Sequence, residues 1–209
     1  MRLTRPRFPH RPRPLTRDPE PGRKGNAIAT RRGLGDTHTS DLGTYGGPNF
    51  KLLCAHITGS GIANSWVCTT HLALAYPDAQ DGSANRAAQT AKIAAVLNPW
   101  VASGRRVVLT GDFNAVPTSS ELGPIYRVQG NGIDADRFWE GDQSDPGYCA
   151  SLCRNMQPTT DTSRKIDYFF ASHRGVDAHT GLSKGVVPTN PVTSGHYIVR
   201  GQVTFTPLG

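Results

Sequence analysis

The chain has 209 residues, with 23 Lys and Arg against 16 Asp and Glu, and a formal net charge of +7. Residues 1–33 hold ten of the basic residues and two acidic ones, so the remainder, with 13 basic and 14 acidic residues, lacks the bulk basic charge of a polyanion-binding domain. The length fits one domain core, and no apolar run approaches the about 20 residues of a membrane-spanning helix.

Residues 1–24 are rich in Arg and Pro and contain few apolar residues. This composition predicts a disordered tail, followed by one domain over residues 25–209. The tail could attach the protein to an anionic partner, or it could be a solvated extension. It has no apolar stretch of the kind that a secretory signal contains.

Short apolar runs bounded by turn residues predict the strands of this domain. Thr58, Gly59, Ser60 and Gly61 separate two such runs and predict a hairpin. The expected strands cover residues 26–30, the two arms of the hairpin within residues 50–71, and residues 107–110, 165–171 and 196–205.

One long amphipathic helix is expected between residues 83 and 102, with Ser83 as its N-cap. Pro99 predicts a break near its end, with Asn98 capping a second short helix. A further short helix is expected within residues 119–126. Residues 129–163 are dense in Gly, Asp and Asn, which predicts long loops.

The four cysteines suggest two disulfides. Cys54 and Cys68 are equally distant from Gly61, so a hairpin centred there would place them opposite each other. Cys149 and Cys153 could form a second, local bridge. Two such pairs favour an oxidising compartment, and hence a secreted or extracytoplasmic protein; four reduced thiols in the cytosol are the alternative. A zinc site is not expected, because no CxxC pair or histidine cluster accompanies them.

The most informative stretch is GDFNAVP, residues 111–117, which follows the apolar run at residues 107–110. Asp112 and Asn114 are two residues apart, so in an extended chain they point the same way. A carboxylate and a carboxamide at one point suit a hard cation and a phosphate oxygen. The alternative is an Asx-turn, in which Asp112 only caps the chain reversal.

Three other stretches place polar groups in or beside apolar segments: TTHLA at residues 69–73, KIDYFFAS at 165–172 and SGHY at 194–197. Together with GDFNAVP and an earlier GNAI at residues 25–28, they resemble the endonuclease/exonuclease/phosphatase family of DNase I-like phosphoesterases. The resemblance implies an α/β fold of the α+β type, in which two stacked mixed sheets flanked by helices form a four-layer sandwich, here lacking its first strands. The motif residues would gather at one end.

The resemblance also implies roles for individual residues. His196 matches the catalytic histidine, and Asp167 matches the carboxylate that orients it. Asp112 and Asn114 match the pair that orients water, binds the scissile phosphate or holds a divalent ion, expected to be Mg²⁺ or Mn²⁺. His71 matches a second histidine that contacts the phosphate.

A role in contacting a phosphate is also expected for Arg31, although an arginine at a strand end is commonly only solvated. For His71 the alternative is a capped strand end. Two positions depart from the family's pattern. No strand-borne glutamate, the family's principal metal ligand, is seen before Gly25, where only Glu20 stands between two prolines. Gly195 occupies a position that typically holds Asp.

The leading expectation is a Mg²⁺-dependent phosphodiester hydrolase of nuclease type, monomeric, whose activity the missing glutamate would impair. A lipid or inositol phosphatase of the same family is the first alternative, and the near-neutral charge beyond residue 33 permits it. A non-catalytic pseudoenzyme that binds an anionic partner is the second.

Overall fold

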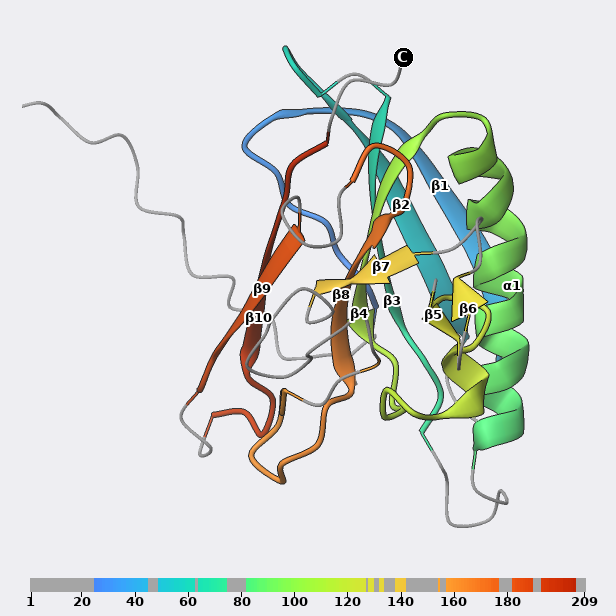
Figure 1. Cartoon of the computed structure of the whole chain (residues 1–209), viewed down its shortest axis with the longest axis vertical. Coiled ribbons are helices and arrows are strands. Elements are labelled where there is room, and N and C mark those ends of the chain that lie inside the picture. Colours follow the sequence, from blue (N-terminus) through green and yellow to red (C-terminus); the bar gives the residue numbers. More distant parts are fainter. Residues whose placement is uncertain are drawn as a thin grey trace, which may run out of the picture.

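A six-stranded mixed sheet forms the centre of the protein, with a long helix on one face and a two-stranded sheet on the other (Figure 1). In this computed structural model, the described residues are 25–44, 49–62, 64–74, 82–126, 128–129, 132–133, 138–141, 154, 157–176, 182–189 and 193–205. The predicted tail, Cys149 and Cys153 lie outside these ranges.

The large sheet has the strand order β1-β2-β3-β4-β8-β7. Only β3 and β4 run parallel in it, and α1 connects them; every other neighbouring pair is antiparallel. Two small antiparallel sheets pair β9 with β10 and β5 with β6. The elements are β1 (Gly33–Gly43), β2 (Phe50–Thr58), β3 (Ser65–His71), α1 (Ser83–Ala102), β4 (Arg106–Asp112), the 3₁₀ turn η1 (Ser120–Leu122), β5 (Val128–Gln129), β6 (Gly132–Ile133), β7 (Phe138–Glu140), β8 (Asp167–Ser172), β9 (Leu182–Val187) and β10 (Ile198–Val203).

The alternation of side chains along the strands gives the sheet two different faces. One face packs against α1 and forms the main core, which includes Leu52, Val107, Leu109, Tyr168 and Phe170 from the strands and Ile93, Leu97 and Val101 from the helix. The other face of β4 and β8 packs against β10, where Phe169 and Ala171 lie with Val199 and Val203. The expected two stacked sheets with a helix outside are therefore confirmed. Among the described residues, no helix covers the outer face of β9 and β10.

The hairpin of β2 and β3 confirms the predicted register. Cys54 stands directly opposite Cys68, and the two are joined by a disulfide whose cysteines are fully buried on the helix-facing side. The bridge therefore lies within the core under α1, shielded from solvent.

The structure differs from the expected elements at residues 26–30 and 119–126, and it contains strands that were not expected. Residues 26–30 form no strand; Asn26 instead donates a side-chain hydrogen bond to the Lys51 carbonyl, and the strand begins at Gly33. Neither β1, an exposed edge strand, nor β9 was expected, because a polar edge strand has no apolar alternation to reveal it. The short helix expected within residues 119–126 is only the single turn η1.

The helix α1 continues through Pro99, so the expected break is wrong. Pro99 lies in the last turn and is exposed, where a proline removes one hydrogen bond near the helix end and its ring can face solvent. The N-cap is Gly82, in the left-handed conformation with φ 57°, and Ser83 is the first helical residue.

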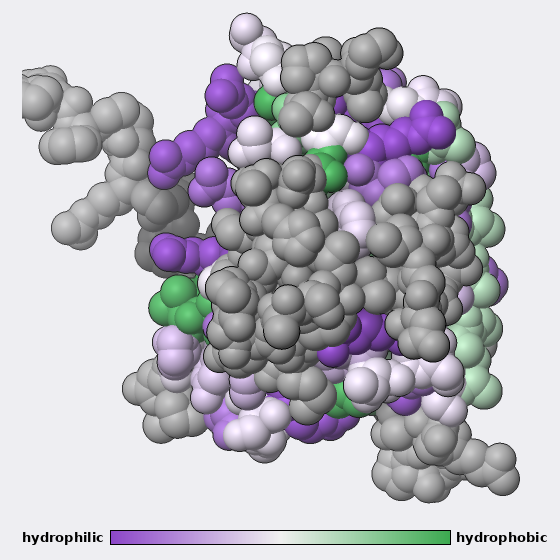
Figure 2. All heavy atoms as spheres, viewed as in Figure 1, coloured by the Kyte–Doolittle hydropathy of each residue, from purple (hydrophilic) through white to green (hydrophobic). Residues whose placement is uncertain are grey.

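Most large apolar side chains of the described residues are buried. The coloured part of the face seen in Figure 2 shows only small areas of strong green among purple and pale residues. Two exposed apolar residues, Val187 and Ile198, stand opposite each other on β9 and β10. In the described part of the chain, none of the helices combines the length and apolar character needed to cross a membrane.

Candidate active site

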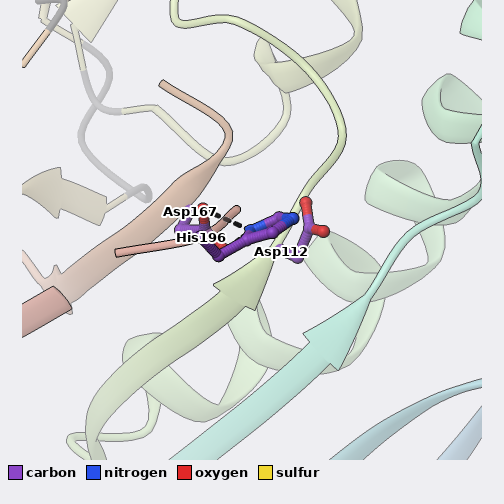
Figure 3. Close-up of side chains that lie close together, drawn as sticks. All are labelled: Asp112, Asp167 and His196. Atoms are coloured by element: carbon purple, nitrogen blue, oxygen red, sulfur yellow. Dashed lines mark hydrogen bonds and ion pairs between the residues drawn. The ribbon is translucent and has the colours of Figure 1, made fainter. Parts of the chain in front are cut away.

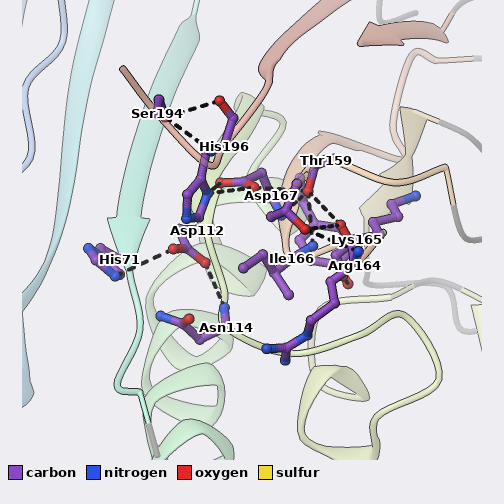
Figure 4. Close-up of polar contacts among 12 residues, drawn as sticks. His71, Asp112, Asn114, Thr159, Arg164, Lys165, Ile166, Asp167, Ser194 and His196 are labelled. Atoms are coloured by element: carbon purple, nitrogen blue, oxygen red, sulfur yellow. Dashed lines mark hydrogen bonds and ion pairs between the residues drawn. The ribbon is translucent and has the colours of Figure 1, made fainter. Parts of the chain in front are cut away.

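The polar residues predicted from sequence lie at one end of three adjacent strands (Figure 4). His71 ends β3 and pairs in register with Asp112 at the end of β4, which in turn pairs with Asp167 at the start of β8. Residues in register on neighbouring strands share a face of the sheet, and the strands are about 4.8 Å apart. The strand register alone therefore brings these three side chains together, on the face that packs against β10.

Gly111 permits the close approach of β4 to β3 immediately before Asp112. Its φ is 140°, and a Cβ atom there would collide with the Thr70 carbonyl. Any other residue would push the strands apart at this point, so Gly111 fixes the position of Asp112 relative to His71.

Asp112 is largely buried and its two oxygens face different partners. Oδ1 accepts a hydrogen bond from the Asn114 backbone N–H at 2.9 Å, and Oδ2 lies 3.5 Å from His71 Nε2. Burial raises the pKa of Asp112 above its ordinary value, and the charge of Asp167 raises it further, against the opposing effect of the Asn114 hydrogen bond. The Asx-type bond expected as the alternative is thus present, within the same cluster.

Asn114 is held rigidly beside Asp112. It adopts φ 49°, in the left-handed region that Asn tolerates, and its Nδ2 donates to the Leu72 carbonyl at 2.9 Å. This bond fixes the amide plane and leaves Oδ1 as the acceptor available to a ligand.

His196 reaches the strand ends from the segment that precedes β10. Its Nδ1 lies 3.0 Å from Asp167 Oδ2 and 3.2 Å from Oδ1. The imidazole lies between Asp167 and Asp112, with its second nitrogen facing Asp112 (Figure 3). Backbone contacts hold the segment: His196 forms a bridge with Thr160, and its N–H donates to Ser194 Oγ at 3.0 Å.

Asp112, Asp167 and His196 each offer one ligand atom within 4.8 Å of the others, and among the described residues they form the one group of this kind. A divalent ion fits the donor chemistry: Mg²⁺ binds through one or two carboxylates and keeps several waters, and burial disfavours an uncompensated charge on Asp112. Asp112 would hold the ion, with Asn114 Oδ1 beside it.

The structure does not bring Arg31 to this cluster. Arg31 stands two residues before Gly33, which pairs with Thr58 at the end of the sheet where β3 and β4 begin. Asp112 is at the opposite end of β4, six residues from Arg106. At about 3.3 Å per residue, this separation is roughly 20 Å.

The two glutamates among the described residues do not belong to the cluster, because each is paired with another side chain. Glu121 pairs with Arg86 at 3.0 Å and Glu140 pairs with Lys165 at 2.8 Å, in both cases buried. The carboxylate of Asp161, however, stands beside Gly195, where a Cβ atom would lie 3.2 Å from Asp161 Oδ1.

Thr159 is a polar residue of the site that the sequence reasoning placed in a loop. It is fully buried and donates a hydrogen bond to Asp167 Oδ2 at 2.9 Å. Its only signal in the sequence is a Thr-Thr pair shortly before the KIDYFFAS motif.

A sequence profile of the endonuclease/exonuclease/phosphatase family matches residues 3–187. The chain belongs to this family. No curated protein matches the sequence significantly.

Solved structures with the same fold include the human Nocturnin catalytic domain with bound sulfate (16% identity, TM-score 0.55, covering 83% of this chain and 61% of that one). Truncated TDP2 from Caenorhabditis elegans matches at 14% identity and TM-score 0.58, covering 86% of this chain and 69% of that one. An endonuclease/exonuclease/phosphatase from Beutenbergia cavernae matches at 19% and 0.58, covering 86% and 48%. At these identities the likeness is one of fold, and the chain spans between about half and two thirds of their lengths.

Proposed function

We propose that this member of the family is a metal-dependent phosphodiester hydrolase that acts on nucleic acid. The observation that carries the proposal is the cluster of His196 with Asp167 and the buried Asp112, whose ligand atoms lie within 4.8 Å of one another. It combines a proton acceptor, a carboxylate to orient it and a second carboxylate for a cation.

His196 is the proposed general base. Its Nδ1 faces Asp167 at 3.0 Å, which favours the tautomer with the proton on Nδ1 and leaves Nε2 to accept a proton from the attacking water. The Asp167 carboxylate stabilises the imidazolium that results. His196 is half-exposed, so water and substrate can reach the ring.

Asp112 and Asn114 are the proposed holders of Mg²⁺ or Mn²⁺ and of a phosphoryl oxygen. A bound divalent ion would neutralise charge on the phosphoryl oxygens and stabilise the leaving oxygen. His71, half-exposed and 3.5 Å from Asp112, is placed to contact the phosphate from the β3 side.

The family description includes nucleases and phosphatases, so the substrate class needs separate support. Attack of water on a phosphodiester or on a phosphomonoester needs one proton acceptor and stabilisation of the leaving oxygen, so the cluster serves either class, and the choice of a nucleic-acid diester is decided by the substrate test below. The buried disulfide Cys54–Cys68 supports an oxidising, extracytoplasmic setting for this activity.

The test is a Mg²⁺ and Mn²⁺ titration followed by plasmid nicking, with release of phosphate from inositol and lipid headgroups measured in parallel. We expect ion-dependent nicking that Asp112→Asn abolishes. Release of headgroup phosphate without nicking would replace the nuclease by the phosphatase alternative. Ion and nucleic-acid binding without turnover of either substrate would instead identify a pseudoenzyme, a result compatible with a cluster that neither Glu121 nor Glu140 joins.

A further inference from the structure

Thr159 forms hydrogen bonds with Asp167 and with Tyr197, the residue that follows His196. It is a fully buried threonine in the segment before β8, eight residues from Asp167 in the chain. Its side chain bonds one residue of the pair, and its backbone bonds the segment that carries the other.

The hydroxyl of Thr159 has all of its hydrogen-bonding positions used. Oγ1 accepts from the backbone N–H groups of Ile166 and Asp167, each at 3.1 Å. A hydroxyl has one donor and two acceptor positions, so its proton is left for Asp167 Oδ2 at 2.9 Å; the other candidate acceptor, the Arg164 carbonyl, is farther away at 3.5 Å. The direction of the bond is therefore settled, and it orients the carboxylate.

The backbone of Thr159 holds the histidine side of the pair. Its carbonyl accepts a hydrogen bond from the N–H of Tyr197, the residue after His196, at 2.8 Å. Its own N–H donates to the Arg164 carbonyl at 2.8 Å, which closes the turn over residues 159–164. One residue thus sets the distance between Asp167 and the chain that bears His196.

We propose that Thr159 is a positioning residue, whose hydroxyl aligns Asp167 with His196 for proton transfer. This inference rests on the proposed function, in which His196 is the base. Hydrogen bonds that orient the ligands of metal sites contribute about 10–100-fold to affinity or activity, and we expect an effect of the same order for this bond to Asp167. The effect should appear in kcat and not in KM, because Thr159 is buried and does not face the substrate.

The test compares Thr159→Val with Thr159→Ser in the full chain. Valine keeps the shape and loses the hydroxyl, and we expect kcat for plasmid nicking to fall about 10–100-fold with KM unchanged. Serine should restore most of kcat. Thr90→Val is the matched control, because Thr90 is also fully buried and donates to carbonyls, but on α1; it should lower stability and leave kcat unchanged.

Two further measurements separate positioning from stability. In the Asp167→Ala background, Thr159→Val should have no further effect on kcat, since Thr159 acts through Asp167. Long-range ¹H–¹⁵N spectra should show His196 mainly protonated on Nδ1 in the wild type and in Thr159→Ser, with a shift toward the Nε2 tautomer in Thr159→Val. The spectra need no turnover, so they decide the positioning claim even if the proposed hydrolysis fails. An unchanged tautomer in Thr159→Val, or equal loss of kcat in Thr90→Val, would overturn the proposal.

Discussion

Gly201 on β10 controls how closely the second sheet packs on the first. A Cβ atom at this position would overlap three atoms of the Phe169 ring, which lies on β8 and is 8% exposed. Gly185 lies on β9, where it pairs with Arg200 of β10, and a Cβ atom on Gly185 would meet no atom within 4 Å. The same substitution at these two glycines should therefore have opposite effects.

Gly201→Ala would force β10 away from β8 or push the Phe169 ring from its site. Overpacking of this kind typically costs about 1–3 kcal/mol. For a domain of this size, each kcal/mol shifts Tm by about 2–4 °C, so a decrease of about 2–12 °C is expected. Gly185→Ala should be neutral or stabilising by up to about 1 kcal/mol, because it reduces the conformational freedom of the unfolded chain.

Thermal unfolding monitored by circular dichroism measures both variants against the wild type. His196 lies five residues before Gly201 in the chain, and the two are joined through β10, so Gly201→Ala should also lower any nicking activity. Equal Tm values for Gly201→Ala and Gly185→Ala would refute the close packing of β10 on Phe169. Replacing Phe169 by Leu in the Gly201→Ala variant should recover part of the lost stability, since a smaller side chain leaves room for the methyl group.

Three other predictions concern stability. Replacing Cys54 and Cys68 together by Ala should lower the free energy of unfolding by about 3 kcal/mol, the contribution expected of a disulfide whose cysteines are separated by 14 residues. Urea titration measures this loss, and an unchanged unfolding midpoint would contradict the prediction. Glu140→Ala removes the carboxylate that pairs with the buried Lys165 ammonium and should destabilise the protein by about 3–5 kcal/mol. Replacing both residues, by Glu140→Leu with Lys165→Met, should recover most of this stability. Equal losses for the single and the double variant in the same titration would argue against a buried ion pair. Burial raises the pKa of Asp112 in the folded protein above the ordinary value of 3.8. At neutral pH the ionised carboxylate therefore lowers the free energy of unfolding, and this destabilisation disappears as the pH falls below 3.8, where Asp112 is protonated in the folded and unfolded states alike. Asp112→Asn should therefore raise the Tm of the ion-free protein at neutral pH, with a gain that shrinks on acidification, and a lower Tm at neutral pH would contradict the burial argument.

The parts of the fold that the sequence predicts are those set by local patterns. Equal spacing about Gly61 is enough to place Cys54 opposite Cys68, because a hairpin register follows from its turn. The contact between Asp112 and Asn114 is likewise local, because two residues spaced i, i+2 can close the Asx-type turn in which Asp112 Oδ1 accepts the Asn114 backbone N–H. In both cases, the distance between residues is determined within one short segment.

Features that depend on distant segments were not predicted. Arg31 appeared to belong to a strand of the site, but the pairing of Gly33 with Thr58 places it at the other end of the sheet. Thr159 gains its role only when the chain folds back on Asp167 and Tyr197. Neither β1 nor β9 shows an apolar alternation in sequence, so each is recognised as a strand only from its pairing with a partner strand.

His196, Asp167 and Asp112 are proposed to form one hydrolytic site. The most direct measurement is the initial rate of plasmid nicking over a range of Mn²⁺ concentrations for the wild type, His196→Ala and the control His38→Ala, whose histidine lies on β1 beside Trp100. We expect Mn²⁺-dependent nicking in the wild type and in His38→Ala, and its loss in His196→Ala with the fold and Mn²⁺ binding retained. Nicking by His196→Ala at the wild-type rate would contradict it.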